Sequence, residues 1–229
     1  MQTHTCFLLS YVKFGDNDAF LHCFSADAGF QSFFAKGLYL SKNKKKPYLF
    51  PLNQLAVSVV KAGASKKIPT VSKLELAAEY VEVKDVRMQS ILFFAAEFLH
   101  QVLREEQQND VAFEAISIFR EDIKNNNFNA HINLLVRFLG ISGVAPLTND
   151  YKFLDPESGN FTHEIAHPLF TEEISQIWKT FLMTENIGEI SLIRDSRNSF
   201  LDSLLIYYHQ HFFGFYTPNS LAVLRQIFE

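Results

Sequence analysis

The stretch TCFLLSYVKFGDNDAFLHCF, residues 5–24, decides the fold of the N-terminal part of this 229-residue chain. Two apolar, β-rich runs flank the turn residues Gly-Asp-Asn at 15–17, and apolar and polar side chains alternate along the runs with a period of two. Such alternation is typical of strands with one buried face, and a Gly-Asp-Asn cluster between two runs predicts a hairpin. We therefore expect antiparallel strands at residues 5–12 and 19–24.

Three further runs extend this hairpin to a small barrel. They have the same β-rich character, are separated by turn residues or by a lysine-rich loop, and predict strands at residues 30–37, 55–61 and 70–80. Five short antiparallel strands in about 80 residues are typical of a closed barrel of the OB type. The predicted fold class is α+β, with a five-stranded OB-type β-barrel as an N-terminal domain of residues 1–84, followed by an all-α helical domain of residues 85–229.

The helical domain is predicted from apolar side chains that recur every three or four positions from about residue 87 onward. The expected helices are residues 88–104, 109–124, 129–139, 171–183, 195–211 and 219–228. Asn109 and Thr171 are expected as N-caps, and Gly140 as the end of the third helix. Residues 143–170 are polar and interrupted by proline and glycine, so we expect a long irregular connection there.

Charge is distributed unevenly along the chain. The formal net charge is −4, yet residues 28–74 hold nine lysines and no Asp or Glu, so this block carries +9 and the remaining residues carry −13. Clustered ammonium groups displace condensed counterions from phosphates, and such an asymmetry points to contact with nucleic acid. The N-terminal part is therefore a basic module on an acidic protein.

The strongest candidate for this contact is the loop after the third expected strand. Its lysines would attract phosphates irrespective of base sequence, and tyrosine rings beside them can stack on unpaired bases. The predicted DNA-binding residues are Lys36, Tyr39, Lys42, Lys44, Lys45, Lys46 and Tyr48, with a second group at Lys61, Lys66, Lys67 and Lys73 extending the path. The alternative is a solvated loop whose charges only keep the protein in solution, with the second group facing away from the groove.

Composition favours a folded cytosolic protein. Hydrophobic residues make up 48% of the chain and charged residues 20%, which excludes a disordered chain. The longest apolar run, residues 91–99, contains Glu97 and is too short to span a bilayer, and the N-terminus lacks a signal pattern. Cys6 and Cys23 lack the spacing of a zinc or disulfide motif, so we expect small core residues. Membrane contact and cofactors are not expected.

One segment imitates an enzyme motif. His163-Glu164-Ile165-Ala166-His167 matches the H-E-x-x-H pattern of zinc proteases, which requires a helix to bring both histidines to one metal. Pro168 disfavours helical geometry at His167, so we expect a polar loop and no metal. The sequence also lacks the phosphate-loop, dinucleotide-binding and nucleophile-elbow patterns, so an enzyme is not expected. A zinc hydrolase using this segment is retained as the third-ranked hypothesis.

Two sets of short stretches, one at each end of the chain, form a recognisable order. The N-terminal stretches are FLLSYVKFGD (7–16), GFQSF (29–33), AKG (35–37) and FPLNQL (50–55), and the C-terminal ones are LLIYYH (204–209), HFFGF (211–215) and Ser220-Leu221. Together they resemble the RecO family of bacterial recombination mediators, in the zinc-less form of Bacteroidetes-like bacteria. LLVRFLG (134–140) is similar to the family's apolar helix ending in Leu-Gly. Two features depart from the family. Residues 143–170 lack the cysteines of the zinc module that many members carry, and Asn219 replaces the usual Lys before the final Ser.

The resemblance implies a non-enzymatic DNA repair and recombination mediator, cytoplasmic and nucleoid-associated. Such a protein binds single-stranded and double-stranded DNA, interacts with RecR, promotes RecA loading and assists strand annealing. It also binds the C-terminal tail of single-stranded DNA-binding protein, for which the candidate residues are Arg137, Leu134, Phe138, Arg194 and Arg197. The alternative for Arg137, Leu134 and Phe138 is a helix core with a surface arginine, and Arg194 and Arg197 could serve either DNA or a partner. The alternative function is a protein-interaction adaptor whose barrel does not bind DNA.

Overall fold

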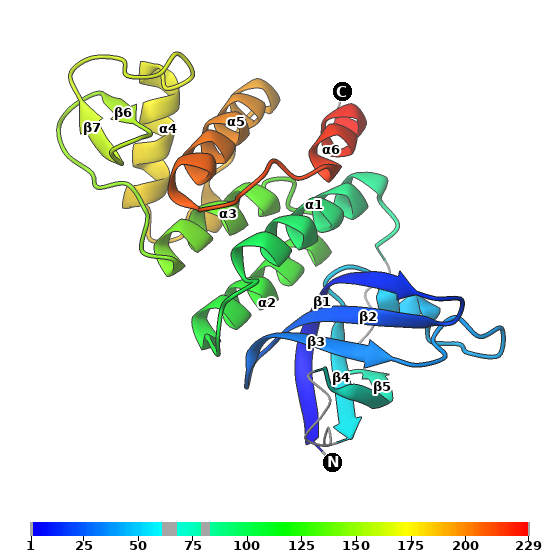
Figure 1. The fold of residues 1–229 in the computed structure, drawn as a ribbon. Helices are drawn as coiled ribbons and strands as arrows, with labels where there is room; N and C mark the ends of the chain where they lie inside the picture. Colours follow the sequence, from blue (N-terminus) through cyan, green and yellow to red (C-terminus); the bar gives the residue numbers. More distant parts are fainter. Residues whose placement is uncertain (1, 61–67, 79–82, 229) are drawn as a thin grey trace. The chain divides into compact units, whose positions relative to one another are not determined.

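The computed structural model describes residues 2–60, 68–78 and 83–228, in which a five-stranded barrel precedes six α-helices (Figure 1). The barrel strands are β1 (Gln2–Phe14), β2 (Asp18–Ser25), β3 (Gly29–Ala35), β4 (Gln54–Val60) and β5 (Thr70–Leu76). They close in the order β1-β2-β3-β5-β4, with β3 and β5 parallel and the other neighbouring strands antiparallel. The predicted fold, an OB-type barrel followed by helices, is confirmed.

The first strand closes the barrel because it pairs with two partners. Its N-terminal half pairs with β4 from Gln2 to Phe7, and its C-terminal half pairs with β2 from Cys6 to Phe14. The register of the second pairing shifts between Leu8 and Ser10, and Leu8 and Leu9 are both buried. A bulge of this kind bends a strand and increases its twist, so the single strand β1 can pair with β4 along one half and with β2 along the other.

Small and apolar side chains fill the barrel interior. Cys6 and Cys23 are fully buried there, as expected for core residues. Burial raises the pKa of the Cys23 thiol well above its ordinary value, and the neighbouring Cys6 thiol adds to the shift. Because both side chains are fully buried, they act as small apolar groups in the core.

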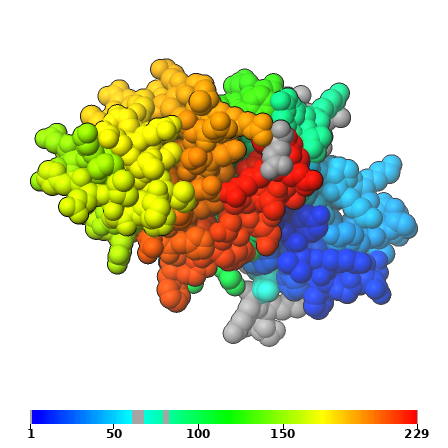
Figure 2. All heavy atoms as spheres, turned by 90° about the horizontal axis from the view of Figure 1, so that it is seen from above, coloured from blue at the N-terminus to red at the C-terminus, as the bar shows by residue number. Residues whose placement is uncertain are grey.

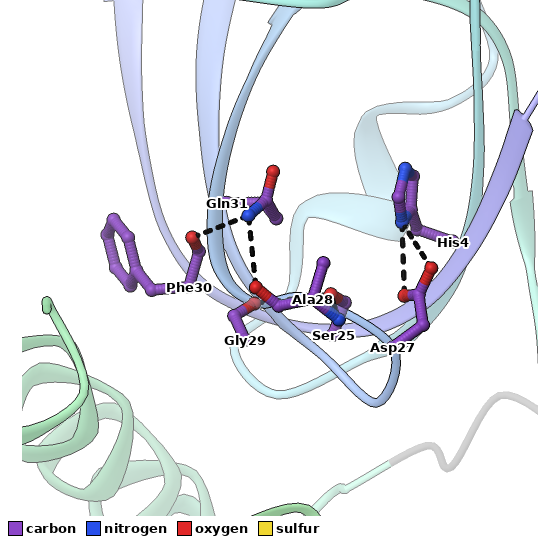
Figure 3. A network of polar contacts seen from close by, with 7 residues as sticks. All are labelled: His4, Ser25, Asp27, Ala28, Gly29, Phe30 and Gln31. Carbon is purple, nitrogen blue, oxygen red and sulfur yellow. Dashed lines mark hydrogen bonds and ion pairs between the residues drawn. The ribbon is translucent and has the colours of Figure 1, made fainter. Parts of the chain in front are cut away.

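The turn between β2 and β3 is fixed by side chains of β1, of β2 and of the turn itself (Figure 3). The Ser25 hydroxyl accepts a hydrogen bond from the Ala28 amide and donates one to the Gly29 carbonyl, both at 3.2 Å. His4 on β1 reaches across to Asp27, whose two carboxylate oxygens lie 3.0 and 2.9 Å from Nδ1. Gly29 has a φ of +71°, a conformation that favours glycine.

The helices are α1 (Val86–Val102), α2 (Asp110–Lys124), α3 (Ala130–Ile141), α4 (Glu172–Met183), α5 (Arg194–His211) and α6 (Ser220–Phe228), with short 3-10 turns at Lys46–Leu49 and Ile187–Glu189. All six expected helices are present. Thr171 caps α4 by accepting from the Ile174 amide, and Asn109 accepts from the Ala112 amide at the start of α2. The expected end at Gly140 was wrong, because α3 continues to Ile141.

The expectation that residues 143–170 form an irregular connection was also wrong in part. Two three-residue strands, β6 (Phe153–Asp155) and β7 (Asn160–Thr162), form an antiparallel hairpin within it. Leu154 and Phe161 are buried, and the Leu154 amide donates to the Ser175 hydroxyl of α4 at 3.0 Å. The hairpin is held by these buried side chains, and three-residue strands are too short to show a period in the sequence.

The chain folds into two compact units. The first comprises Met1–Glu114 with Pro218–Glu229, and the second comprises Ala115–Thr217. In the first unit α1 packs against β1 and against α6. The change from strands to helices lies between β5 and α1, and the proposed domain boundary at residues 84 and 85 stays a prediction. Within the described ranges, the helices fall short of the length and hydropathy needed to cross a membrane.

Candidate nucleic-acid interface

The lysine loop, residues 36–48, is anchored to the barrel near both of its ends. Leu38 near its start and Leu49 just after its end are buried in the barrel core, with Tyr39 and Tyr48 partly buried against the same core. Apolar anchors at both ends of a polar loop restrict the backbone and leave the side chains between them outside. In the space-filling view the light-blue atoms of this region lie at the surface beside dark-blue atoms of the first strands (Figure 2).

Hydrogen bonds give the loop a defined shape. Asp18 Oδ1 accepts from the Gly37 amide at 2.7 Å, and the Tyr39 amide donates to the Asn17 carbonyl at 2.9 Å. The Asn43 side chain connects two parts of the loop. Its NH2 group donates to the Gly37 carbonyl at 3.0 Å, and its Oδ1 accepts from the Lys45 amide at 2.9 Å. The backbone that carries the lysines is therefore preorganised.

This backbone presents a group of like charges to solvent. Four of the predicted lysines are exposed and the fifth, Lys45, is half-buried; the exposed ones are Lys36, Lys42, Lys44 and Lys46. Like charges at a surface repel one another, and a polyanion relieves that repulsion. The four exposed ammonium groups are the feature of the loop that best suits phosphate.

The Tyr39 ring has two ammonium groups over it. Lys46 from the loop and Lys13 from β1 each place Nζ 5.6 Å from the ring centroid. Burial, and secondarily the neighbouring Tyr11, raise the pKa of the Tyr39 hydroxyl. Sequence reasoning missed Lys13, because it lies about 25 residues before the loop and only the barrel brings the two segments together.

The structure describes only Lys73 of the second group of predicted lysines. Lys61, Lys66 and Lys67 lie outside the residues that the structure describes. Lys73 on β5 is exposed and forms an ion pair of 2.9 Å with Glu75. An adjacent carboxylate offsets part of the attraction that Lys73 offers to a phosphate.

The predicted partner-binding residues of α3 lie in the second unit. Leu134 and Phe138 are each 1% exposed and belong to the core of that unit, whereas Arg137 between them is half-buried. A partner could reach those two apolar side chains only after local opening of the core. Of the three residues, the arginine is the one that retains access to solvent.

Two further predicted residues start α5. Arg194 is exposed, and burial together with the Arg194 charge lowers the pKa of the half-buried Arg197. Burial, with a smaller effect of Arg197, also lowers the pKa of His131 on α3 to about 3, so this histidine is neutral at physiological pH. The start of α5 therefore carries two positive charges next to a neutral imidazole.

The H-E-x-x-H segment is not helical, as expected. Residues 163–167 form bends between β7 and α4. The His163 ring packs on Tyr151 with centroids 3.8 Å apart, and His167 Nδ1 accepts from the Leu169 amide at 3.2 Å. Among the residues that the structure describes, no group of three or more His, Cys, Asp or Glu side chains is placed to hold a metal. The segment therefore lacks the geometry that zinc proteolysis requires.

Comparisons with known proteins agree with the barrel and the helices. Residues 1–80 match the family model described as recombination protein O N terminal. The chain is 26% identical to the DNA repair protein RecO of Flavobacterium psychrophilum over 96% of both chains, and 28% identical to that of Christiangramia forsetii over 100% of both. It is 34% identical to the RecO of Phocaeicola vulgatus over 61% of this chain and 62% of that one. The N-terminal part of the chain therefore matches the RecO family model, and the chain is similar over nearly its whole length to DNA repair proteins named RecO.

Proposed function

We propose that this protein is a recombination mediator that binds single-stranded and double-stranded DNA through the lysine loop of its barrel. The observation that supports this most strongly is the exposure of four lysines on one short, anchored loop of a basic module. Phosphate contacts by lysine carry no base sequence, so binding would be general for DNA. The protein would act in the cytoplasm, in association with the nucleoid.

The proposed mechanism requires no bond chemistry. Ammonium groups that neutralise phosphates on two strands lower the repulsion between those strands, which favours annealing. Contact with RecR and with the C-terminal tail of single-stranded DNA-binding protein would bring the mediator to coated DNA and promote RecA loading. For that acidic tail, the accessible candidates are the guanidinium groups of Arg137, Arg194 and Arg197.

The test is charge reversal on the loop, with a matched control elsewhere. Lys42 and Lys44 are exposed, so replacing both by Glu leaves the core intact and changes the net charge from −4 to −8. Lys124 and Lys152 are exposed residues of the second unit, and replacing both by Glu gives the whole protein the same net charge of −8. Anisotropy of a labelled oligonucleotide should show weaker binding for the loop variant, with a salt slope about 1.4 lower for single strands, since each phosphate contributes roughly 0.7.

The rival functions make different predictions. If the protein is an adaptor that does not bind DNA, the unchanged protein fails to shift the anisotropy. If binding reflects overall charge alone, the loop variant and the control variant weaken it equally, and the proposed site is wrong. Stoichiometric zinc in the purified protein would revive the hydrolase hypothesis.

A further inference from the structure

The ring of Tyr39 lies where two lysines from separate segments of the first unit meet. Lys13 comes from β1, and Lys46 begins the 3-10 turn at the end of the lysine loop. Each places its Nζ over the ring, 5.6 Å from the centroid. An ammonium group within about 6 Å of a ring centroid is attracted by the negative face of the ring. Two positive charges from distant parts of the sequence therefore share one aromatic ring.

The backbones that carry these three side chains are held in place. Lys13 is directly opposite the buried Ala19 of β2, so its side chain leaves the sheet on the inner side, where Tyr39 packs against the barrel core. The Tyr39 amide donates to the Asn17 carbonyl at 2.9 Å. A proline directly follows Lys46 and restricts the backbone there. The meeting of the two lysines at the ring is therefore a product of the fold.

The two ammonium groups have no carboxylate partner. Within the part of the chain that the structure describes, neither Lys13 nor Lys46 takes part in an ion pair. The carboxylate of Asp18, at the same end of the β1-β2 hairpin, instead accepts the Gly37 amide at 2.7 Å. Burial raises the pKa of the Tyr39 hydroxyl, so the phenol is neutral at physiological pH and only the face of its ring attracts cations. Two neighbouring positive charges without a counter-charge attract an anion.

A ring that holds two lysines prepares them for a ligand. Fixing a long side chain at an interface costs free energy, equivalent to a roughly twofold to tenfold loss of affinity for each side chain. Lysines that are already held over a ring avoid part of that loss. A base that stacked on Tyr39 would, in contrast, compete with both ammonium groups for the same ring.

We propose that Tyr39 is a positioning residue, whose ring holds Lys13 and Lys46 so that both contact the phosphates of DNA. This inference rests on the proposed function and goes beyond it in two respects. It adds Lys13, which lies outside the lysine loop, as a phosphate contact. It also gives the Tyr39 ring a task other than the base stacking predicted from the sequence. Because single strands and duplex both carry phosphates, the ring then acts on both forms.

The first experiment distinguishes a ring that holds lysines from a ring that stacks on bases. Tyr39→Leu removes the ring but keeps an apolar side chain against the barrel core, Tyr39→Phe keeps the ring, and Tyr151→Leu is the matched control in the second unit. We expect Tyr39→Leu to weaken binding of a single-stranded oligonucleotide and of a duplex of the same length by the same factor, about tenfold, and Tyr39→Phe to restore it. The Tyr151→Leu protein should bind as the unchanged protein does.

The second experiment tests the added contact. Lys13→Gln should make the slope of log K against log salt shallower by about 0.7 for single strands and about 0.9 for duplex, because one phosphate contact is lost. Lys152→Gln, at an exposed lysine of the second unit, is the control with the same change of charge. In the Tyr39→Leu protein, Lys13→Gln should weaken binding by a smaller factor than in the unchanged protein, whereas a purely structural role of the ring gives factors that multiply.

Nuclear magnetic resonance tests the geometry without DNA. Protons over an aromatic ring are shifted upfield by its ring current, so the Cε methylene resonances of Lys13 and Lys46 should lie upfield of those of other lysines. Tyr39→Leu should abolish this shift, and Tyr39→Phe should keep it. Circular dichroism and thermal melting of each variant confirm that it is folded.

The outcomes separate this inference from the function on which it rests. If the unchanged protein binds neither DNA form, the proposed function fails and the inference fails with it. If the unchanged protein binds DNA but Tyr39→Leu weakens only single-strand binding, the ring stacks on bases and the inference alone is overturned. It is overturned equally if the two lysine resonances show no ring-current shift, or if Lys13→Gln leaves the salt slope unchanged, and neither of these results requires Tyr39→Leu to fold.

Discussion

The contact between Glu97 and the start of α6 gives a prediction whose magnitude follows from the structure. Glu97 on α1 accepts hydrogen bonds from the Asn219 and Ser220 amides at 2.8 and 3.0 Å, from the Ser220 hydroxyl at 2.7 Å and from the Asn219 side chain at 3.1 Å. The carboxylate thus satisfies the free amides of a helix start and opposes the positive end of its dipole.

Glu97→Gln removes the charge. It also replaces one of the two acceptor oxygens by an NH2 group, which cannot accept hydrogen bonds from these donors. A lost helix cap costs about 1 kcal/mol, and a hydrogen bond to a charged group contributes roughly 1.5–3 kcal/mol when buried. Glu97 is half-exposed, so solvent screening reduces the latter value. We therefore expect the free energy of unfolding to fall by about 1–2 kcal/mol, measured by urea denaturation, with faster hydrogen exchange in residues 219–228.

The effect should depend on pH. Burial alone would raise the pKa of Glu97 from its ordinary value of 4.5, but hydrogen bonds from Ser220 and Asn219 outweigh it and leave the pKa lowered. Stability from the ionised carboxylate is therefore present above pH 4.5 and is lost as the pH falls through the lowered pKa. The difference between Glu97→Gln and the unchanged protein should shrink across that range. The reasoning is refuted if the difference is the same at acidic and neutral pH, or no larger than for the exposed control Glu105→Gln.

Three further predictions concern packing and metal content. Gly29→Ala should lower the urea midpoint strongly, by an equivalent of about 2 kcal/mol or more, because the new Cβ would meet the Gln107 backbone at 2.3 Å and φ is +71°; an unchanged midpoint would contradict the turn geometry. Ser203→Ala should destabilise the second unit by about 1–2 kcal/mol, since the buried Trp178 indole loses its acceptor at 3.0 Å, and tryptophan emission during unfolding measures this. Elemental analysis should find less than stoichiometric zinc, and treatment with a metal chelator should leave the melting temperature unchanged.

Local patterns predicted the barrel strands and the helices because each shows its period over several residues. The hairpin turn at residues 15–17 and the cap at Thr171 were identified from turn and capping residues alone. The full length of β1 was not predicted, because pairing with β4 and β2 extends the strand at both ends beyond the predicted residues 5–12. The strands β6 and β7 were missed because three residues cannot establish a period of two, and contacts with α4 hold them in place.

The part of the candidate site whose residues are adjacent in the sequence could be predicted. The lysines of one loop are adjacent in sequence, so their exposure on one short segment follows from the chain. The position of Lys13 over Tyr39 depends on strand pairing, which no local window contains. The pattern of the apolar segment 134–140 is compatible with a core helix and with a partner groove, and only tertiary packing shows that Leu134 is buried.

The measurement that tests the account most directly is the salt dependence of binding between the unchanged protein and bare single-stranded DNA. If the four exposed lysines of the loop each neutralise one phosphate, the slope of log K against log salt is about −2.8, and affinity falls roughly 50-fold between about 50 and 200 mM salt. A flat salt dependence, or no binding to bare single strands at the lower salt concentration, would contradict the central claim that this barrel binds DNA through its lysine loop.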